Sequence, residues 1–262
     1  MVRRPAPVLA KRRRRRPGRA SLSFGLPLLA FVYFCVAPAL PVLPAGDERL
    51  LVAGGVGMLM VAATALSLVP ARDTTFGPLL ILLGAGLIVA FLNVGGVGAV
   101  ANVPEALLAA TVGLLFARLL STPLIAIAVP LFVAAIDIWS VASGPTSRLL
   151  QAPGDRVDSL SFDLPTWGDG GSVGRLGLSD AVFVSMFAAW AWRYGFRRGA
   201  TLVGLALGLV ASLVLGVLTN RAIPALPLVA AGYLLPNLDR IVGVLRMERG
   251  EPPDRPADEQ HR

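Results

Sequence analysis

Long apolar stretches alternate with short polar breaks along almost the whole chain. A helix needs about 20 residues to cross the roughly 30 Å hydrocarbon core of a bilayer. Eight stretches have about this length, and they run over residues 25–44, 50–70, 77–99, 103–120, 122–142, 176–194, 200–219 and 222–238. We therefore predict an all-α fold: a polytopic transmembrane helix bundle with about eight spans, or nine if a further helix is present.

One polar break is much longer than the others and divides the chain into two halves. It covers residues 143–175 and is rich in Gly, Pro and Asp, which is typical of an aqueous loop. A five-helix half over residues 25–142 precedes it, and a three-helix half over residues 176–246 follows it. Outside these halves lie a basic tail over 1–24 and a polar tail over 247–262, which we expect to be disordered.

The composition agrees with a membrane protein. Apolar residues make up 55% of the chain and charged residues 15%, against about 25% in an ordinary soluble protein. The net charge of +8 is concentrated in residues 1–19, which hold nine Lys and Arg residues and no acid. A basic segment just before the first apolar stretch indicates cytoplasmic orientation and contact with anionic lipids, rather than nucleic-acid binding.

Cysteine and histidine occur only once each. Cys35 lies in an apolar stretch and His261 in the polar C-terminal tail. A disulfide within the chain, a histidine-based metal site and a Ser-His-Asp triad are therefore excluded. We expect the protein to use no metal ion and no organic cofactor.

Arginines beside the apolar stretches predict the orientation, because cytoplasmic ends of transmembrane helices carry an excess of Lys and Arg. With eight spans, the breaks on the side of the basic N-terminus and the C-terminal segment contain Arg72, Arg118, Arg193, Arg197, Arg198, Arg240, Arg246 and Arg249. We therefore predict a multi-pass protein of the cell membrane, with both termini cytoplasmic and the loop 143–175 outside. The first stretch should stay as a helix, because Ala37-Pro38-Ala39 makes a poor signal-peptide cleavage site.

Two carboxylates lie inside apolar stretches, Asp137 in 122–142 and Asp180 in 176–194. An ionisable group inside a membrane helix costs about 3 kcal/mol or more, so each is a candidate functional residue. The two helices are expected to be antiparallel neighbours, with both acids roughly 6–8 Å below the same surface. As alternatives, Asp180 is a helix N-cap supported by Ser179, or Asp137 reaches the interface from its helix end.

Two carboxylates that face each other share one proton, because both cannot ionise cheaply at close range. The ionised group can take a proton from water as a general base, while the protonated group donates to a peptide carbonyl as a general acid. This is the chemistry of aspartic proteases. The sequence leaves open which of Asp137 and Asp180 is the acid.

Three motifs accompany the two acids: Asp137-Ile138-Trp139-Ser140-Val141, Gly177-Leu178-Ser179-Asp180 and Pro224-Ala225-Leu226-Pro227. In this order, over residues 120–240, they resemble the presenilin and signal peptide peptidase family of intramembrane aspartyl proteases, with its Gly-x-Gly-Asp and Pro-Ala-Leu motifs. The chain differs from that pattern in Ser179, which replaces a glycine, and in having eight rather than nine apparent spans.

The resemblance implies an intramembrane aspartyl endopeptidase that hydrolyses peptide bonds in transmembrane segments. Asp137 and Asp180 would be catalytic, and the other residues of the second and third motifs would support them. Pro224 and Pro227 are expected to interrupt regular helix beside the acids, with a simple helix start as the alternative. The expected partners are a transmembrane peptide or protein substrate and membrane lipids, while the natural substrate and the oligomeric state stay open.

A short strand is possible inside the long loop, because polar and apolar residues alternate from Ser159 to Leu164 and Pro165 ends the pattern. We expect its free edge to pair with an unwound substrate segment, which makes Leu160, Phe162 and Leu164 candidates for substrate binding. An ordinary surface turn is the alternative.

Two other functions fit the same acids. A prepilin-peptidase-like enzyme also uses Gly-x-Gly-Asp, but its catalytic face is cytoplasmic and it gives Pro-Ala-Leu-Pro no role. In a proton-coupled transporter or an inactive scaffold, Asp137 and Asp180 would carry protons or only pack.

Overall fold

The structure is a computed structural model that describes residues 18–73, 77–94, 98–143, 161–168, 170–221 and 223–248. It is mostly helical, and each predicted apolar stretch contains one main helix. In chain order these are α1 (Gly18–Val36), α3 (Gly55–Ser67), α4 (Gly77–Val94), α5 (Asn102–Leu119), α6 (Pro123–Ser143), α8 (Leu178–Arg193), α9 (Arg198–Thr219) and α10 (Ala225–Leu234). Shorter helical pieces extend several of them: η1 (Ala37–Ala39), α2 (Asp47–Arg49), η2 (Leu50–Gly54), η3 (Val69–Asp73), η4 (Gly98–Ala101), η6 (Leu235–Asn237) and α11 (Leu238–Glu248).

Within the described residues, five helical segments are long and apolar enough to cross a membrane: Asp47–Asp73, Gly98–Leu119, Pro123–Ala142, Arg198–Thr219 and Ala225–Arg246. Two further apolar helices are shorter, Phe24–Ala39 and Leu80–Val89. The helix α8 has 16 residues, fewer than the roughly 20 that a straight crossing needs. These are the features of a polytopic membrane protein, and the count of eight spans stays a prediction.

The outer helices turn large apolar side chains away from the bundle. Leu80, Leu87 and Phe91 on α4 are more than half exposed, as are Phe132 and Trp139 on α6. A soluble protein rarely exposes apolar surface of this extent. Lipid tails are as apolar as leucine, so such helices lose nothing by facing a bilayer.

The centre of the bundle is α8, which packs against α5. Trp190 is fully buried, and its indole N–H donates to the carbonyl oxygens of Ala117 at 3.2 Å and Leu120 at 3.1 Å. Farther along α5, any side chain at Gly113 would collide with the backbone carbonyl of Val182 on α8. This close approach determines where the start of α8, with its candidate acid, lies.

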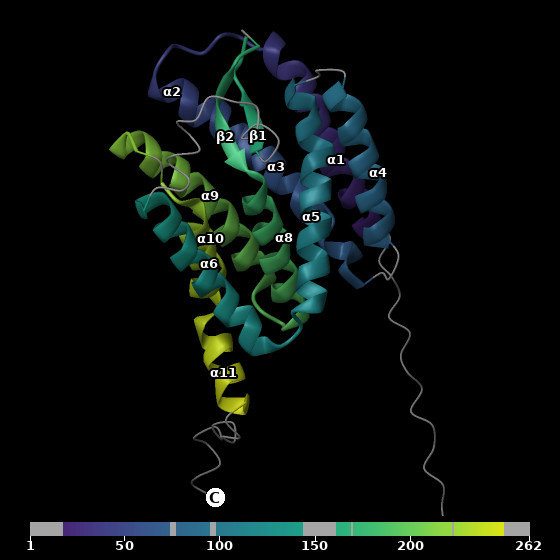
Figure 1. The fold of residues 1–262 in the computed structure, drawn as a ribbon, viewed down its shortest axis with the longest axis vertical. Coiled ribbons are helices and arrows are strands. Elements are labelled where there is room, and N and C mark those ends of the chain that lie inside the picture. Colours follow the sequence, from purple (N-terminus) through teal and green to yellow (C-terminus); the bar gives the residue numbers. More distant parts are fainter. Residues whose placement is uncertain are drawn as a thin grey trace, which may run out of the picture.

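A two-stranded antiparallel hairpin departs from the all-α expectation and lies at one end of the bundle, above α8 (Figure 1). Its strands are β1 (Ser161–Pro165) and β2 (Ser172–Gly177), with Phe162 opposite Leu176. The strand β1 lies where the alternating pattern indicated one, whereas β2 was not predicted. Because β2 pairs with β1, α8 begins at Leu178, two residues later than the sequence pattern indicated.

Candidate active site

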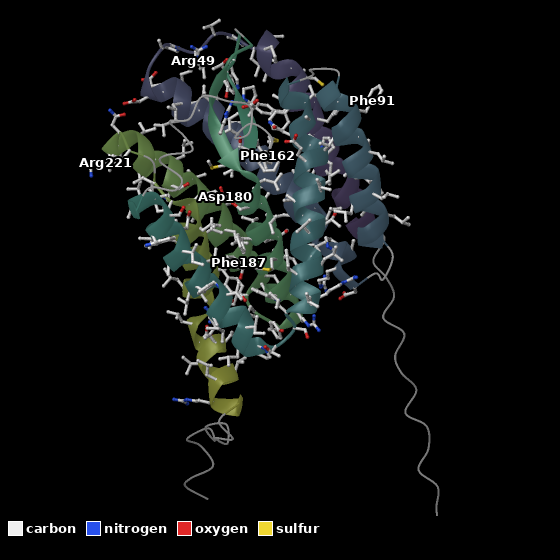
Figure 2. The ribbon with its side chains drawn as sticks, viewed as in Figure 1. Arg49, Phe91, Phe162, Asp180, Phe187 and Arg221 are labelled. Atoms are coloured by element: carbon white, nitrogen blue, oxygen red, sulfur yellow. The ribbon has the colours of Figure 1, made fainter. Side chains whose placement is uncertain are left out.

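The two predicted catalytic carboxylates lie at the end of the bundle that carries the hairpin. Asp137 is half-buried near the end of α6, and Asp180 is the third residue of α8 and 8% exposed. Figure 2 shows Asp180 just below the hairpin. The helices α6 and α8 that carry the two acids are in contact with each other. The structure therefore places the two acids that the sequence pattern singled out on neighbouring helices, at the same end of the bundle.

Asp180 lies in the first turn of α8. Gly177 is the N-cap residue, with an extended conformation (φ −64°, ψ 139°), and Asp180 is the third residue of the helix. An acid at this third position is the one that faces back toward the N-cap residue in a capping box. Asp180 is therefore not the N-cap itself, which removes that alternative explanation of its position.

Glycine at position 177 leaves room for the carboxylate. A Cβ atom there would lie 3.2 Å from Asp180 Oδ2 and 3.3 Å from Ser179 Oγ, tighter than most contacts of real Cβ atoms. Ser179, which replaces the glycine of the similar family motif, is exposed, and Leu178 packs against the core. The serine side chain therefore does not fill the space between α8 and its neighbours.

The motif Pro224-Ala225-Leu226-Pro227 forms the start of α10. Pro224 is the N-cap residue in an extended conformation (φ −62°, ψ 126°), and the helix begins at Ala225. The expectation that the prolines interrupt regular helix is therefore wrong. Proline is well tolerated in the first turn of a helix, because the N–H groups that it lacks would have no partner within the helix.

This helix start binds Asp137. The N–H of Leu226 donates to Asp137 Oδ2 over 3.0 Å, and the Leu226 side chain is buried. N–H groups of a first turn have no acceptor within their own helix, and the positive end of the helix dipole favours a nearby anion. The third motif thus contacts the acid pair through its backbone, a contact that the sequence does not reveal.

The candidate substrate-binding side chains of β1 are part of the core. Phe162 is 0% and Leu164 is 2% exposed, because the apolar face of β1 is turned toward the bundle. These two side chains therefore belong to the core of the protein, and their role in substrate binding stays a prediction. Leu160, the third candidate, lies outside the described residues.

A side chain of α5 occupies the outer edge of β1 at Asp163. Asn102 Nδ2 donates to the Asp163 carbonyl oxygen at 2.5 Å, and the Asp163 N–H donates to Asn102 Oδ1 at 3.2 Å. The buried Asn102 amide thus forms the backbone hydrogen bonds that a neighbouring strand would form. The Asp163 carboxylate forms an ion pair with Arg175 on β2 at 3.2 Å. Sequence reasoning missed Asn102, although a buried amide beside an apolar stretch requires partners.

A further acid lies near the hairpin. Glu105 is half-buried in the first turn of α5. It lies at the start of the apolar stretch predicted over residues 103–120. In the described part of the chain, no group of three or more His, Cys, Asp or Glu side chains is arranged to hold a metal ion.

No model of a known protein family matches the chain, and no curated protein matches it either. A function has to be inferred from the site itself.

Proposed function

We propose that the protein is an intramembrane aspartyl endopeptidase in which Asp137 and Asp180 form the catalytic pair. The observation that carries the proposal is that Asp137 and Asp180 lie at the same end of the bundle on the contacting helices α6 and α8, where Asp137 also accepts the Leu226 N–H. Two carboxylates among apolar helices are costly, and packing alone gives no reason to keep them together. The backbone donor on Asp137 contributes to the rigid positioning that catalysis requires.

Burial suggests which acid has which role. Asp180 is the more buried of the two, and an ionised group is costly to bury, so we assign it the shared proton and the part of general acid. Asp137 is less buried and lies at the positive end of α10, so we assign it the part of general base.

The reaction follows from these two roles. Asp137 takes a proton from water, whose oxygen adds to the carbonyl carbon of the peptide, while Asp180 gives its proton to the carbonyl oxygen. The tetrahedral intermediate then collapses: the C–N bond breaks, the nitrogen takes up the proton held by Asp137, and a hydroxyl proton returns to Asp180. The products are a carboxylic acid and an amine, and both carboxyl groups regain their starting states.

The strand β2 is the better candidate for binding a substrate in extended form. A substrate helix hides its own amide groups, so it has to unwind before water can attack. The strand β2 leads directly into Gly177 and Asp180, and among the described residues no other strand lies on the side of β2 away from β1. Since Asn102 occupies the edge of β1, we infer that the peptide adds to β2 by β-augmentation.

Cleavage of a model transmembrane peptide by the purified protein in lipid nanodiscs tests the proposal. Asp137→Asn and Asp180→Asn should each reduce cleavage at least about 100-fold, because each variant removes a general acid or base while keeping the shape of the side chain. Asp239→Asn is the matched control, because Asp239 is a half-exposed acid at the start of α11. If either Asp137→Asn or Asp180→Asn is folded and still cleaves the peptide at the wild-type rate, the proposal is contradicted.

The same experiment tests one of the two other candidate functions. A transporter or scaffold would not cleave the peptide at all. A prepilin-peptidase-like enzyme gives Pro-Ala-Leu-Pro no role, and the hydrogen bond between Leu226 and Asp137 speaks against that alternative.

A further inference from the structure

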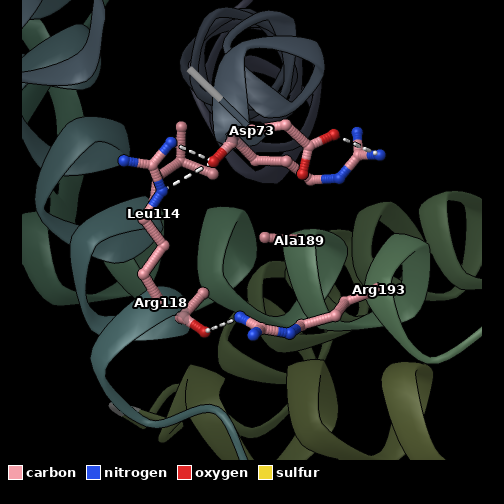
Figure 3. Close-up of a pocket in the computed structure, with 7 residues that line it drawn as sticks. Asp73, Leu114, Arg118, Ala189 and Arg193 are labelled. Atoms are coloured by element: carbon pink, nitrogen blue, oxygen red, sulfur yellow. Dashed lines mark hydrogen bonds and ion pairs between the residues drawn. The ribbon is translucent and has the colours of Figure 1, made fainter. Parts of the chain in front are cut away.

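A cavity of about 450 Å³ lies at the opposite end of α8 from Asp180, between the ends of η3, α5 and α8 (Figure 3). Arg72, Arg118 and Arg193 line it together with Asp73 and the apolar side chains of Leu114 and Ala189. The volume is in the range of ordinary small-ligand sites, which is about 300–1,000 Å³. None of these residues takes part in the proposed proteolysis.

Backbone carbonyls at helix ends hold the three guanidinium groups. The Nε atom of Arg118 donates to the carbonyl oxygen of Arg72 at 2.6 Å. The Nη2 atom of Arg118 donates to the same oxygen. Arg72 Nη1 donates to the Val69 oxygen at 3.3 Å, and Arg193 Nη1 donates to the Ala117 oxygen at 3.4 Å. Long side chains that are already ordered lose less entropy when a ligand binds.

The cavity carries an excess of positive charge. The described lining residues include three guanidinium groups and one carboxylate, that of Asp73. Asp73 pairs with Arg72 at 3.0 Å, and its side chain is 77% exposed. The planar guanidinium group matches the geometry of phosphate oxygens and can bind them in pairs.

Capping of helix C-termini explains why arginines lie here, but it does not explain an open cavity lined by three of them. The wall formed by Leu114, Ala117 and Ala189 is apolar, so the site combines phosphate-binding groups with an apolar surface. This combination is the chemistry of a phospholipid, with a charged phosphate next to a glycerol backbone and acyl chains.

We propose that this cavity binds the phosphate group of an anionic phospholipid of the cytoplasmic leaflet. Arg72, Arg118 and Arg193 belong to the arginines whose distribution predicts that this end of the bundle is cytoplasmic, where anionic lipids attract basic groups. Basic cavities between transmembrane helices on that side bind anionic head groups. The proposal does not depend on the proposed protease activity.

The test measures lipid bound to the full-length protein by native mass spectrometry, with phosphatidylglycerol and phosphatidylcholine offered in equal amounts. The wild type should retain phosphatidylglycerol preferentially. Arg193→Gln should weaken retention about fivefold, which corresponds to about 1 kcal/mol per basic group near a membrane surface. Arg193→Lys keeps the charge and should retain more phosphatidylglycerol than Arg193→Gln.

Arg240→Gln is the matched control, because Arg240 is an exposed arginine on α11 and does not line the cavity. It should leave retention unchanged, and thermal unfolding in detergent checks that each variant is folded. Equal retention by Arg193→Gln and Arg240→Gln would overturn the proposal. A second experiment adds millimolar inorganic phosphate to the lipid-bound and to the delipidated protein. If phosphate displaces the lipid and stabilises the delipidated protein, the site binds a free anion and the assignment to a lipid is wrong.

Discussion

At the scale of single residues, the backbone shapes the surroundings of both carboxylates. The Leu226 N–H donates to Asp137, and Gly177 leaves space for the Asp180 carboxylate beside it. A backbone donor cannot be recognised from residue type, so the contact with Asp137 was not predictable from the motifs. Pro224 is the N-cap residue of the helix that provides this donor.

Gly177→Ala should lower peptide cleavage about tenfold, with only a small effect on stability. Its Cβ would lie 3.2 Å from Asp180 Oδ2, so the carboxylate has to shift by a few tenths of an ångström. A small misplacement of a catalytic group is enough to cost this much activity. Gly84→Ala on α4 is the control, because a Cβ there also meets nothing within 4 Å and the residue lies outside the proposed site. Cleavage rates of the two variants would then differ clearly; equal rates would show that the position of Asp180 tolerates the shift.

At the scale of helices, α10 reaches Asp137 because glycines let it lie directly against α9. A Cβ on Gly204 would overlap the carbonyl group of Gly232, and one on Gly208 would lie 2.6 Å from the Leu228 oxygen. Small residues allow such close backbone approach between membrane helices. The sequence indicated two apolar helices here, but it did not indicate that their contact positions Leu226.

Gly204→Ala should separate α9 from α10, destabilise the protein by about 1–3 kcal/mol and reduce cleavage. Thermal unfolding in detergent and the peptide assay measure the two effects. Gly199→Ala, also on α9, is the control, because a Cβ there has no neighbour within 4 Å. If Gly204→Ala lowered stability but left cleavage at the wild-type level, the position of α10 would not matter for the acid pair.

At the scale of the whole molecule, the two ends of the bundle differ in chemistry. The hairpin and the acid pair lie at one end of α8, and the arginine-lined cavity lies at the other. The positive-inside rule predicts that the arginine end is cytoplasmic and that the hairpin end is outside. A peptidase with this orientation would cut its substrates near the outer surface of the membrane.

Cysteine labelling in intact cells tests this orientation. Cys35 is exposed and is first replaced by serine, after which Ser172→Cys in β2 and Gly199→Cys at the start of α9 are made separately. Both positions are exposed. A membrane-impermeant thiol reagent should label Ser172→Cys in intact cells and Gly199→Cys only after the cells are broken. The reverse pattern would show that the hairpin faces the cytoplasm.

The sequence by itself determined the features that depend on neighbouring residues. Runs of apolar residues indicated the helices, and the cost of a charge in such a run singled out Asp137 and Asp180. Only the tertiary structure decided which distant groups meet. Leu226 and Asp137 are 89 residues apart in the chain, and Asn102 is 61 residues from Asp163. The pairing of β2 with β1 and the gathering of three arginines around one cavity likewise follow from the packing of whole helices, which no local pattern records.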